Sequence, residues 1–289
     1  MQKKKYILGI ESSCDETSVA IVTRNNRDNK QIVLANIVKN QIDVHESFGG
    51  VVPELAARAH SDVIDLLVEQ ALKKAKIKLK DITAVAATTG PGLLGGLLVG
   101  VIAAKTLSSV LKIPFISINH LEGHALSAQL EQDVSFPYLL LLVSGGHTEF
   151  TIVKKFNNYH RIGTTVDDAL GDAFDKTARL LKLGYPGGPQ IEKLAQSGNE
   201  DAYDLPKPLI HENNSYFSFS GLKTSVAQLV HKQKKLTPKI KKDIAASFQK
   251  TIGDIIKIKT KNAINEFVKI TKQKSINIGC WWFCFLNCF

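Results

Sequence analysis

The amino-acid sequence predicts an α/β protein in which one β-turn-β unit occurs twice. Apolar runs flank a short polar centre in residues 6–23, and the same plan returns in residues 139–155. Short apolar runs bounded by polar turns are typical of strands. Between the two units, residues 53–76 carry apolar side chains at the spacing of an amphipathic helix. The alternation of strands and helices favours a sheet covered by helices, and the repeated unit suggests a duplicated fold.

The polar centres of the two units are candidate anion sites. The first is a Ser/Asp/Glu-rich turn that begins at Glu11, and the second is a Ser-Gly-Gly-His turn at residues 144–147. Turns can offer backbone N–H groups to an anion, and glycines permit positive φ and close approach. An ordinary hairpin explains either turn alone, whereas a matched pair is a better candidate for a phosphate clamp.

The segment that follows the amphipathic helix predicts a strand and a closely packed helix. Residues 82–87 form the strand, and residues 93–111 form a long apolar run that contains Gly95, Gly96 and Gly100. Small side chains at these positions suggest that this helix lies very close to the sheet. A phosphate-binding loop is the alternative, but the Gly-Lys-Ser/Thr of the Walker pattern is absent.

Two histidines follow the next predicted strand, residues 113–119. Their four-residue spacing puts the imidazoles of His120 and His124 on one face of a helix, one turn apart. Such a pair is more often an ordinary surface or core feature, but α/β proteins place ligand sites at strand ends, which favours a metal site here. The zinc-protease motif has its general base directly after the first histidine, where this chain has Leu121. Glu122 would point about 200° away around the helix, so the pattern argues against peptide hydrolysis.

Residues 167–178 predict another helix, which opens on Asp167 and Asp168. Acidic residues in the first turn of a helix interact favourably with its dipole. Two further aspartates lie deeper in the segment and are candidates to face a cleft. A Gly/Pro-rich stretch at residues 184–189 ends the helix, and residues 218–224 form a polar turn before a further helix.

Composition favours a globular protein with an anionic partner. The chain has 289 residues, 44% of them hydrophobic and 22% charged, with a formal net charge of +10. A basic chain suggests nucleic acid as a partner, although charge alone does not decide this. The lysines concentrate in residues 232–242 and 257–274, which would offer a face for phosphate contacts.

We expect a cytoplasmic protein with no membrane contact. The apolar run after the N-terminal lysines stops at Glu11, which is too short for a signal peptide. We identify no run of about 18 apolar residues that would span a membrane. Cys14 is the only cysteine before residue 280, as is typical of a reducing compartment.

The last residues, 279–289, differ sharply in composition from the rest. They hold both tryptophans and three of the four cysteines. One interpretation is a hydrophobic anchor or a thiolate site, because the cysteines recur every four residues. A frameshift or a premature end is the other interpretation, and the abrupt change in composition favours it.

Six segments of the chain together resemble one family. They are GIESSCDETSVAIV, HLEGHALSA, LLVSGGHTE, DDALGDAFDKTARLL, YPGGP and FSFSGLKT. In this order they resemble the tRNA N6-adenosine threonylcarbamoyltransferases, formerly labelled O-sialoglycoprotein endopeptidases, from about Lys5 to about Ile278. The resemblance implies the actin-like, Hsp70-like ATPase architecture of two ribonuclease-H-like lobes around a cleft.

The resemblance also implies a reaction and its participants. The family transfers a threonylcarbamoyl group from threonylcarbamoyl-adenylate to the N6 amine of the adenosine beside the anticodon, in tRNAs that read codons beginning with A. Because the acyl adenylate is already activated, no protein nucleophile is needed. The family binds one divalent metal, for which iron is expected and zinc is the alternative. In bacteria it works with an inactive paralogue and a small P-loop ATPase.

The residues that match the family's functional positions fall in three groups. His120 and His124 match its two metal histidines, and Glu11 is the catalytic candidate, placed to steer the incoming amine. Glu192 matches a substrate position that is often aspartate in the family. The full substrate-binding set is Leu142, Val143, Ser144, Gly145, Gly146, Asp175, Gly188 and Glu192.

The family pattern departs from this chain after residue 278. The family continues with an adenine-binding turn, an aspartate that completes the metal site, and closing helices. We therefore expect a first lobe at residues 1–133, an incomplete second lobe with a helical insertion at residues 134–278, and an aberrant tail at residues 279–289. The same departure leads us to expect an impaired activity.

Three other functions remain open at this point. A metalloprotease would agree with the old family label but not with Leu121. An ATP-driven kinase or chaperone of the same fold would show ATPase activity without tRNA. A non-catalytic partner resembling the inactive paralogue would agree with the missing adenine turn but not with the retained His120 and His124.

Overall fold

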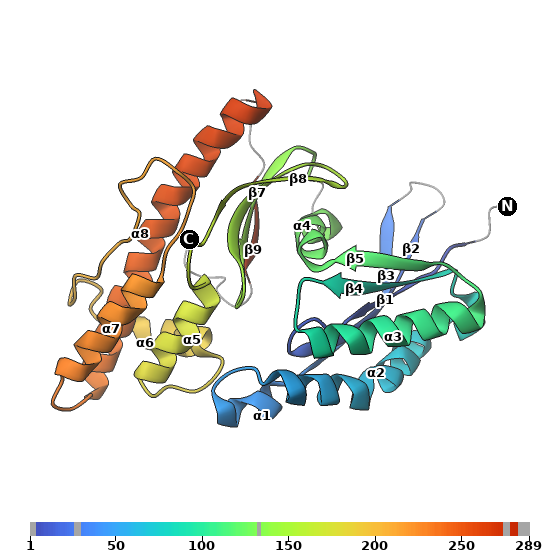
Figure 1. Cartoon of the computed structure of the whole chain (residues 1–289), viewed down its shortest axis with the longest axis horizontal. Helices are drawn as coiled ribbons and strands as arrows, with labels where there is room; N and C mark the ends of the chain where they lie inside the picture. The colour runs from blue at the N-terminus through green and yellow to red at the C-terminus, as the bar shows by residue number, and fades with distance from the viewer. Residues whose placement is uncertain (1–3, 26–29, 132–133, 274–277, 283–289) are drawn as a thin grey trace. The chain divides into compact units, whose positions relative to one another are not determined.

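The computed structural model describes residues 4–25, 30–131, 134–273 and 278–282 of the chain (Figure 1). It divides into two compact units, residues 1–123 and residues 124–289. We had expected the first lobe to end at residue 133. The observed division falls near the other end of the same helix, α4 (His120–Glu131), which begins in the first unit and continues in the second.

The first unit is built on a five-stranded sheet of order β3-β2-β1-β4-β5. Antiparallel pairs join β1 to β2 and β2 to β3, while β4 and β5 are added in parallel. This confirms the predicted β-turn-β unit, and it adds β3, which the sequence analysis did not identify. The strands are β1 (Ile7–Glu11), β2 (Glu16–Arg24), β3 (Gln31–Asn40), β4 (Ala84–Gly90) and β5 (Phe115–Asn119).

Two long helices lie side by side on the sheet of the first unit (Figure 1). The helix α2 (Pro53–Ala75) packs on β2 and β3, and α3 (Leu94–Leu111) packs on β1 and β4. Both confirm predicted helices, and their inner faces join the alternating apolar residues of the strands in one core. The short elements α1 (Ile42–His45), η1 (Glu46–Phe48) and η2 (Leu79–Asp81) complete the unit.

The second unit repeats the strand plan of the first. Its sheet has the order β8-β7-β6-β9, with antiparallel β6–β7 and β7–β8 pairs and a parallel β6–β9 pair. The first four strands of the first sheet have the same order and directions, so the predicted duplication is confirmed. Among the described residues the second sheet has no counterpart of β5. The strands are β6 (Tyr138–Val143), β7 (Thr148–Lys155), β8 (Asn158–Thr164) and β9 (Ile278–Trp282).

Four helices cover the second sheet and carry its core. They are α5 (Leu170–Leu180), α6 (Gly187–Ala195), α7 (Ser220–Lys232) and α8 (Pro238–Thr271). Every residue of β6 is buried, as expected for a central strand with both faces covered. Phe150 of β7 stacks on Phe217 in the segment before α7, and Phe174 of α5 meets Phe248 of α8 edge-on, so aromatic pairs join the elements of this core.

The helix α3 corrects one expectation from the sequence. It is long and apolar enough to cross a membrane by length and composition alone, although we had identified no such run. The same test is passed by core helices of soluble proteins. The small residues of α3 pack on the sheet, and Gly96 accepts a hydrogen bond at its carbonyl from the Ser12 hydroxyl, 2.9 Å away.

The described part of residues 279–289 does not stand apart from the fold. Gly279 to Trp282 belong to β9, in parallel register with β6. Of the strand that we expected at residues 275–278, residues 275–277 lie outside the described residues, and Ile278 belongs to β9, which also includes the first residues of the unusual segment. Residues 283–289, with the last two cysteines, lie outside the described residues.

Candidate functional site

The first unit brings a carboxylate, an imidazole and two hydroxyls together at the carboxyl ends of its parallel strands. His120 Nδ1 lies 3.4 Å from Glu11 Oε2 and 3.1 Å from Ser13 Oγ. Thr88 donates a short hydrogen bond from its hydroxyl to Glu11 Oε2, and the Ser13 amide donates to Glu11 Oε1 over 2.6 Å. Two residues predicted from the sequence, Glu11 and His120, are therefore in direct contact.

The local fold explains this arrangement. Glu11 ends β1 and Thr88 lies near the end of β4, its parallel neighbour, so both side chains reach the same edge of the sheet. Asn119 ends β5 and accepts hydrogen bonds at Oδ1 from the amides of Leu121 and Glu122, as an N-cap does. This cap starts α4 at His120, directly at the strand end.

The surroundings of Glu11 keep it ionised. Burial raises the pKa of Glu11, but hydrogen bonds from His120, Ser13 and Thr88 outweigh this effect and bring the pKa to about 2. An anion held beside His120 favours a proton on Nδ1, so Nε2 is the nitrogen of that ring with which a metal could be held. A carboxylate of such low pKa is a weak proton acceptor, so the arrangement suits electrostatic steering better than proton removal.

The metal at His120 and His124 stays a prediction. His120 and His124 lie one turn apart in the α-helix α4, and the Glu11 carboxylate supplies the outer hydrogen bond that metal-binding histidines commonly have. Within the described residues, no group of three or more His, Cys, Asp or Glu side chains is close enough to hold a metal ion. Among the described residues, the two imidazoles of α4 are therefore the donors that this chain offers to such a metal.

The second unit places the predicted substrate turn against a helix. Leu142 and Val143 end β6 and are buried, so they support the turn rather than line an open surface. Ser144 closes the turn, because its amide donates to the His147 carbonyl over 2.8 Å. The amide of Gly171, in the first turn of α5, donates to the Ser144 carbonyl over 3.2 Å. A Cβ on Gly171 would lie 2.7 Å from that carbonyl oxygen, so only glycine allows this approach.

The remaining predicted substrate residues lie on two helices that touch. Asp175 on α5 accepts a hydrogen bond at Oδ1 from the Gly187 amide at the start of α6, over 2.7 Å. Gly188 follows directly and is buried, and Glu192 lies one turn later on α6. The structure thus joins Asp175 to the segment that carries Gly188 and Glu192, all within the second unit.

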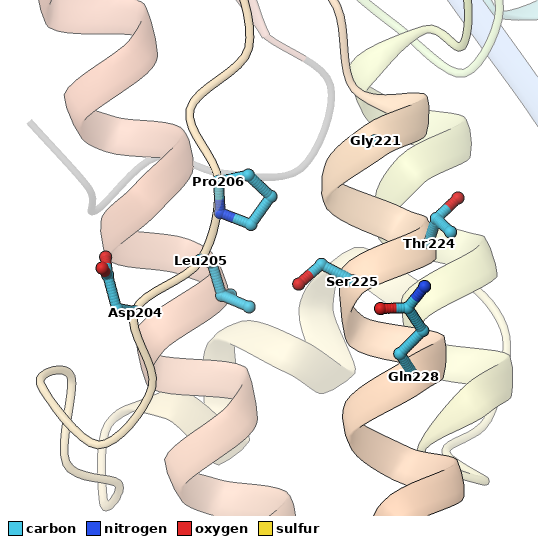
Figure 2. A pocket seen from close by; sticks show the side chains of 7 residues that line it. All are labelled: Asp204, Leu205, Pro206, Gly221, Thr224, Ser225 and Gln228. Atoms are coloured by element: carbon cyan, nitrogen blue, oxygen red, sulfur yellow. The ribbon is translucent and has the colours of Figure 1, made fainter.

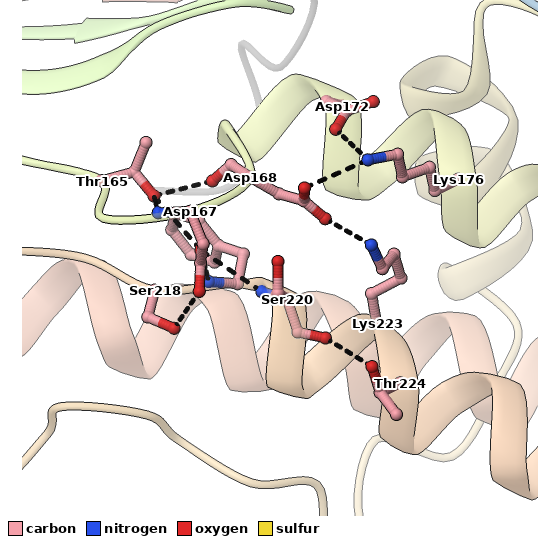
Figure 3. Close-up of polar contacts among 10 residues, drawn as sticks. Thr165, Asp167, Asp168, Asp172, Lys176, Ser218, Ser220, Lys223 and Thr224 are labelled. Atoms are coloured by element: carbon pink, nitrogen blue, oxygen red, sulfur yellow. Dashed lines mark hydrogen bonds and ion pairs between the residues drawn. The ribbon is translucent and has the colours of Figure 1, made fainter.

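The start of α5 corrects the prediction for the two early aspartates. The helix begins at Leu170, so Asp167 and Asp168 precede it and do not complement its dipole. Asp167 accepts hydrogen bonds from the Ser218 hydroxyl and from the Phe219 and Ser220 amides, which holds the start of α7 (Figure 3).

Asp168 belongs to an ion-pair network that joins α5 to α7. It pairs with Lys176 at 3.1 Å and with Lys223 at 2.7 Å (Figure 3). Burial raises the pKa of Asp168, but the hydrogen bonds from the two lysines dominate and lower it below its usual value. The two aspartates between β8 and α5 therefore make hydrogen bonds and ion pairs with the start of α7, and do not lie in the first turn of α5.

A pocket of about 610 Å³ lies elsewhere on the second unit, between α7 and the segment at residues 204–206 (Figure 2). Thr224, Ser225 and Gln228 line it from one side of α7, with Asp204 opposite. None of the predicted functional residues lines this pocket, so we assign it no part in the site.

Sequence reasoning missed two members of the first cluster. Ser13 lies inside the first motif and Thr88 at the end of a predicted strand, but neither position carried a spacing signal of its own. Parallel pairing of β1 and β4 is what brings Thr88 to Glu11, and two strands separated by more than 70 residues do not reveal their register in sequence.

Comparison with known proteins identifies relatives over most of the chain. A family model described as tRNA N6-adenosine threonylcarbamoyltransferase matches residues 32–280. A protein of that name from Pelagibacter ubique (strain HTCC1062) is 52% identical over 282 residues, which are 96% of this chain and 78% of that protein. Relatives of the same name from Bartonella tribocorum and Rickettsia rickettsii (strain Sheila Smith) are 56% and 51% identical, over 90% and 92% of this chain and 71% and 76% of their own length.

Solved structures give a more distant likeness. Component A of the (R)-2-hydroxyglutaryl-CoA dehydratase of Acidaminococcus fermentans aligns over 96% of this chain and 92% of its own, with 14% identity and a TM-score of 0.47. The Aquifex aeolicus PPX-GPPA enzyme aligns over 96% of both chains, with 10% identity and a TM-score of 0.39.

Proposed function

This chain belongs to the family of tRNA N6-adenosine threonylcarbamoyltransferases, transferases that modify tRNA, and we propose how its own residues serve that reaction. The donor would be threonylcarbamoyl-adenylate and the acceptor the N6 amine of the adenosine beside the anticodon, in tRNAs that read codons beginning with A. The match over residues 32–280 carries this assignment, and it takes precedence over a protease, a kinase or a non-catalytic partner. The cytoplasm, where tRNA is modified, is the proposed location.

The first cluster would receive the reacting groups. Glu11 is fixed by hydrogen bonds from three side chains or amides, so its charge is held in place before the substrate arrives. A preorganised carboxylate orients a neutral amine by accepting its N–H and stabilises the positive charge that develops during attack. No protein nucleophile is required, because the adenylate is an activated acyl donor.

A divalent metal, iron first and zinc as the alternative, is proposed for His120 and His124. When bound, it would supply Lewis-acid polarisation of the carbamoyl or phosphate group. The support from this chain is the helical spacing of the two imidazoles and the Glu11 carboxylate behind His120.

The second unit would bind the adenylate. The Ser144–Gly146 turn offers backbone N–H groups, and the start of α5 lies against it through Gly171. Helix N-termini and glycine turns favour phosphate groups, which fits a leaving adenylate. Asp175, Gly188 and Glu192 are proposed to contact the nucleotide or the threonyl part.

A transfer assay tests the proposed function. Purified chain, synthase, threonine, bicarbonate, ATP and tRNA are combined with the paralogue and the P-loop ATPase, and digested tRNA is analysed by mass spectrometry. We expect modified adenosine with the complete mixture, little without either partner, and a loss of at least about 100-fold for Glu11→Gln or His124→Ala. Metal content of each variant is measured in parallel, and His160→Gln, at an exposed position on β8, serves as the matched control. A folded chain that gives no product would contradict the proposal.

The connection between α7 and α8 is the proposed tRNA surface. Six lysines lie within eleven residues there, and none of them forms an ion pair with a carboxylate in the described residues. Three of them are in the first turns of α8, where cations oppose the helix dipole and cost stability. Helix stability therefore does not account for these three, whereas a phosphate would be favoured by both the lysines and the helix N-terminus. The six are Lys232, Lys234, Lys235, Lys239, Lys241 and Lys242.

Salt dependence of binding tests this surface. Replacing Lys239, Lys241 and Lys242 by alanine should weaken tRNA binding and lower the slope of log Kd against log salt by about 2 to 3. A control with the same charge change removes Lys73, Lys74 and Lys80 from the first unit, for which we expect a slope change below about 1. Equal slopes for both triple variants would contradict the proposed surface.

Support for a protein partner comes from the outer face of α3. Leu94, Leu98, Ile102 and Val110 are 73%, 48%, 61% and 74% exposed and follow one another at four- or eight-residue steps. They form a stripe on the side opposite the small residues that pack on the sheet. We propose that a protein partner of the modification complex covers this stripe.

A further inference from the structure

A chain of buried polar side chains lies behind the first turn, outside the cluster around Glu11. His45 and His60 are both fully buried, and Gln41 lies between them. His45 Nε2 is 3.1 Å from Gln41 Oε1, Gln41 Nε2 is 3.1 Å from His60 Nδ1, and His60 Nε2 is 3.2 Å from the Cys14 carbonyl oxygen. We call His45, Gln41 and His60 the relay.

Backbone groups fix the direction of every hydrogen bond in the relay. The Val52 amide can only donate, and it lies 3.3 Å from His45 Nδ1, so this nitrogen accepts and the proton of His45 is on Nε2. Gln41 then accepts at Oε1 and donates from Nε2, an orientation that the Ala56 carbonyl, 3.4 Å from Nε2, also requires. His60 accepts at Nδ1 and donates from Nε2 to Cys14.

The relay ends on the turn that carries the catalytic candidate. Three consecutive carbonyls of this turn accept hydrogen bonds from other segments. The backbone N–H of Leu93 donates to the Ser13 carbonyl over 2.7 Å, His60 donates to the Cys14 carbonyl, and the backbone N–H of Gln41 donates to the Asp15 carbonyl over 3.0 Å. Two of these three anchors come from the relay. The turn includes Ser13, whose amide and hydroxyl contact Glu11 and His120.

We propose that His60 is a positioning residue for the transfer reaction and that the relay releases the Ser12–Glu16 turn when His60 takes up a proton. A proton on His60 Nδ1 would face the side-chain NH2 group of Gln41, 3.1 Å away, which sets two donors against each other and leaves only the Thr17 hydroxyl, at 2.7 Å, as an acceptor. Acid would therefore weaken the hydrogen bond that holds the turn and disturb the positions of Glu11 and Ser13; we call this hydrogen bond the latch. The link to transfer rests on the proposed function, whereas the latch itself does not.

The groups around His60 agree with this behaviour. Burial lowers the pKa of His60, while the Cys14 carbonyl and the carboxylates of Glu11 and Asp15 act in the opposite direction and His45 adds to the lowering. Thr17 on β2 also contacts Nδ1 at 2.7 Å, and α3 packs on the ring at Gly96 without a charged group. Because the folded state binds fewer protons than the unfolded chain, the latch is fully closed above about pH 6.5 and weakens as the pH falls below it.

The tautomers give the first test, and it needs no activity. Long-range proton–nitrogen NMR spectra of histidine-labelled protein at pH 7.5 should show both His45 and His60 protonated at Nε2 alone, with the assignment made by loss of a signal in His45→Gln and His60→Gln. A ring protonated at Nδ1, or doubly protonated, would overturn the relay.

The pH profile gives the second test. His60→Gln retains a donor for Cys14 and an acceptor for Gln41 but does not titrate, so it should retain transfer at pH 7.5 within about 3-fold. Between pH 6.5 and 5.5, wild-type protein should lose up to about ten-fold more activity than His60→Gln, the limit for one coupled proton. His60→Leu, which lacks the donor, should lose activity at every pH, with hydrogen exchange of the turn amides raised relative to the rest of the first unit.

The controls separate this inference from the proposed function. His160→Gln, exposed on β8, should follow the wild-type profile. Identical acid loss in wild type and His60→Gln would overturn the latch. If neither the wild-type protein nor any variant transfers at any pH, the proposed function fails. The histidine tautomers, and the pH dependence of amide hydrogen exchange in the turn of wild type and His60→Gln, still show whether the relay exists.

Discussion

Replacing Gly96 by alanine is expected to lower the free energy of unfolding by about 2 kcal/mol and to impair transfer. A Cβ at this position would lie 2.4 Å from the Ser12 carbonyl oxygen and 3.1 Å from the His60 ring. The Ser12 oxygen is backbone in an anchored turn, so it cannot rotate away as a flexible side chain would. Overpacking of this kind costs about 3 kcal/mol, and the better helix propensity of alanine returns only about 1 kcal/mol.

Gly253→Ala is the matched control for this substitution. Gly253 lies inside α8, and nothing is within 4 Å of the place where its Cβ would be. The same chemical change should here raise the free energy of unfolding by about 0.5 to 1 kcal/mol. Urea unfolding of both variants checks the opposite signs. A stability gain for Gly96→Ala would show that α3 can move away from the turn at little cost.

The sequence could predict the elements with strong, regular patterns. The strands around Glu11 and the Ser144 turn are buried on alternate or on all positions, and the buried stripe of α2 is apolar except at His60. Such patterns are visible in the sequence, because apolar residues recur at the period of a strand or of a helix when one face of that element is buried in the core. The close packing of α3 also followed from its glycines, of which Gly96 and Gly100 are buried.

The elements that were missed are those with weak patterns. The edge strand β3 is exposed over most of its length, so its sequence shows little alternation. The predicted start of α5 is too early because Asp167 and Asp168 resemble acids of a first helical turn. In the structure Asp167 instead accepts a hydrogen bond from Ser218, and Asp168 forms an ion pair with Lys223. Local sequence cannot reveal that a carboxylate is used by a distant helix.

The candidate site was predictable as a set of residues but not as an arrangement. Motifs supplied Glu11, His120 and Asp175, and the structure added the contacts that fix them, from Thr88, Ser13 and the Gly187 amide. The relay had no sequence signal, since a buried histidine in an amphipathic helix resembles any other polar position. Parallel strand pairing and helix packing decide these contacts, and both are long-range.

Replacing Lys259 by methionine is expected to lower the free energy of unfolding by about 2 kcal/mol, and the loss should grow sharply when Asn262 is also replaced. Lys259 is fully buried in α8. Its ammonium donates to the carbonyls of Glu212 and Asn214 and to Asn214 Oδ1, over 3.1 to 3.2 Å. Burial lowers the pKa of Lys259, and the Glu212 carboxylate opposes this. Three acceptors compensate the burial of the charge, so removing it leaves a loss rather than a gain.

The single loss is limited because each acceptor has a second donor. Asn262 Nδ2 lies 3.3 Å from the Glu212 carbonyl and 2.9 Å from the Asn214 carbonyl, and the Tyr216 amide donates to Asn214 Oδ1 over 3.1 Å. Asn262→Ala alone should therefore cost about 1 kcal/mol. In the double variant both carbonyls lose every side-chain donor, and the half-buried Asn214 carbonyl then pays part of the cost of about 1 to 3 kcal/mol for an unsatisfied buried acceptor, whereas water can reach the exposed Glu212. We expect a total of about 4 to 5 kcal/mol, which exceeds the sum of the single losses.

A double-mutant cycle measured by urea unfolding checks this coupling, with Lys261→Met, exposed on the same helix, as the control for loss of a lysine. The control should change stability by less than about 0.5 kcal/mol. Strictly additive losses would mean that the two donors do not support the same carbonyls.

The coupling matters for the whole second unit. The segment that Lys259 and Asn262 hold continues to two contacts with β8: the Ser215 carbonyl lies against Gly163, and the Phe217 amide donates to the Thr164 carbonyl. Loss of both donors would therefore loosen the attachment of α8 to the edge of the sheet, and hydrogen exchange should rise first at β8.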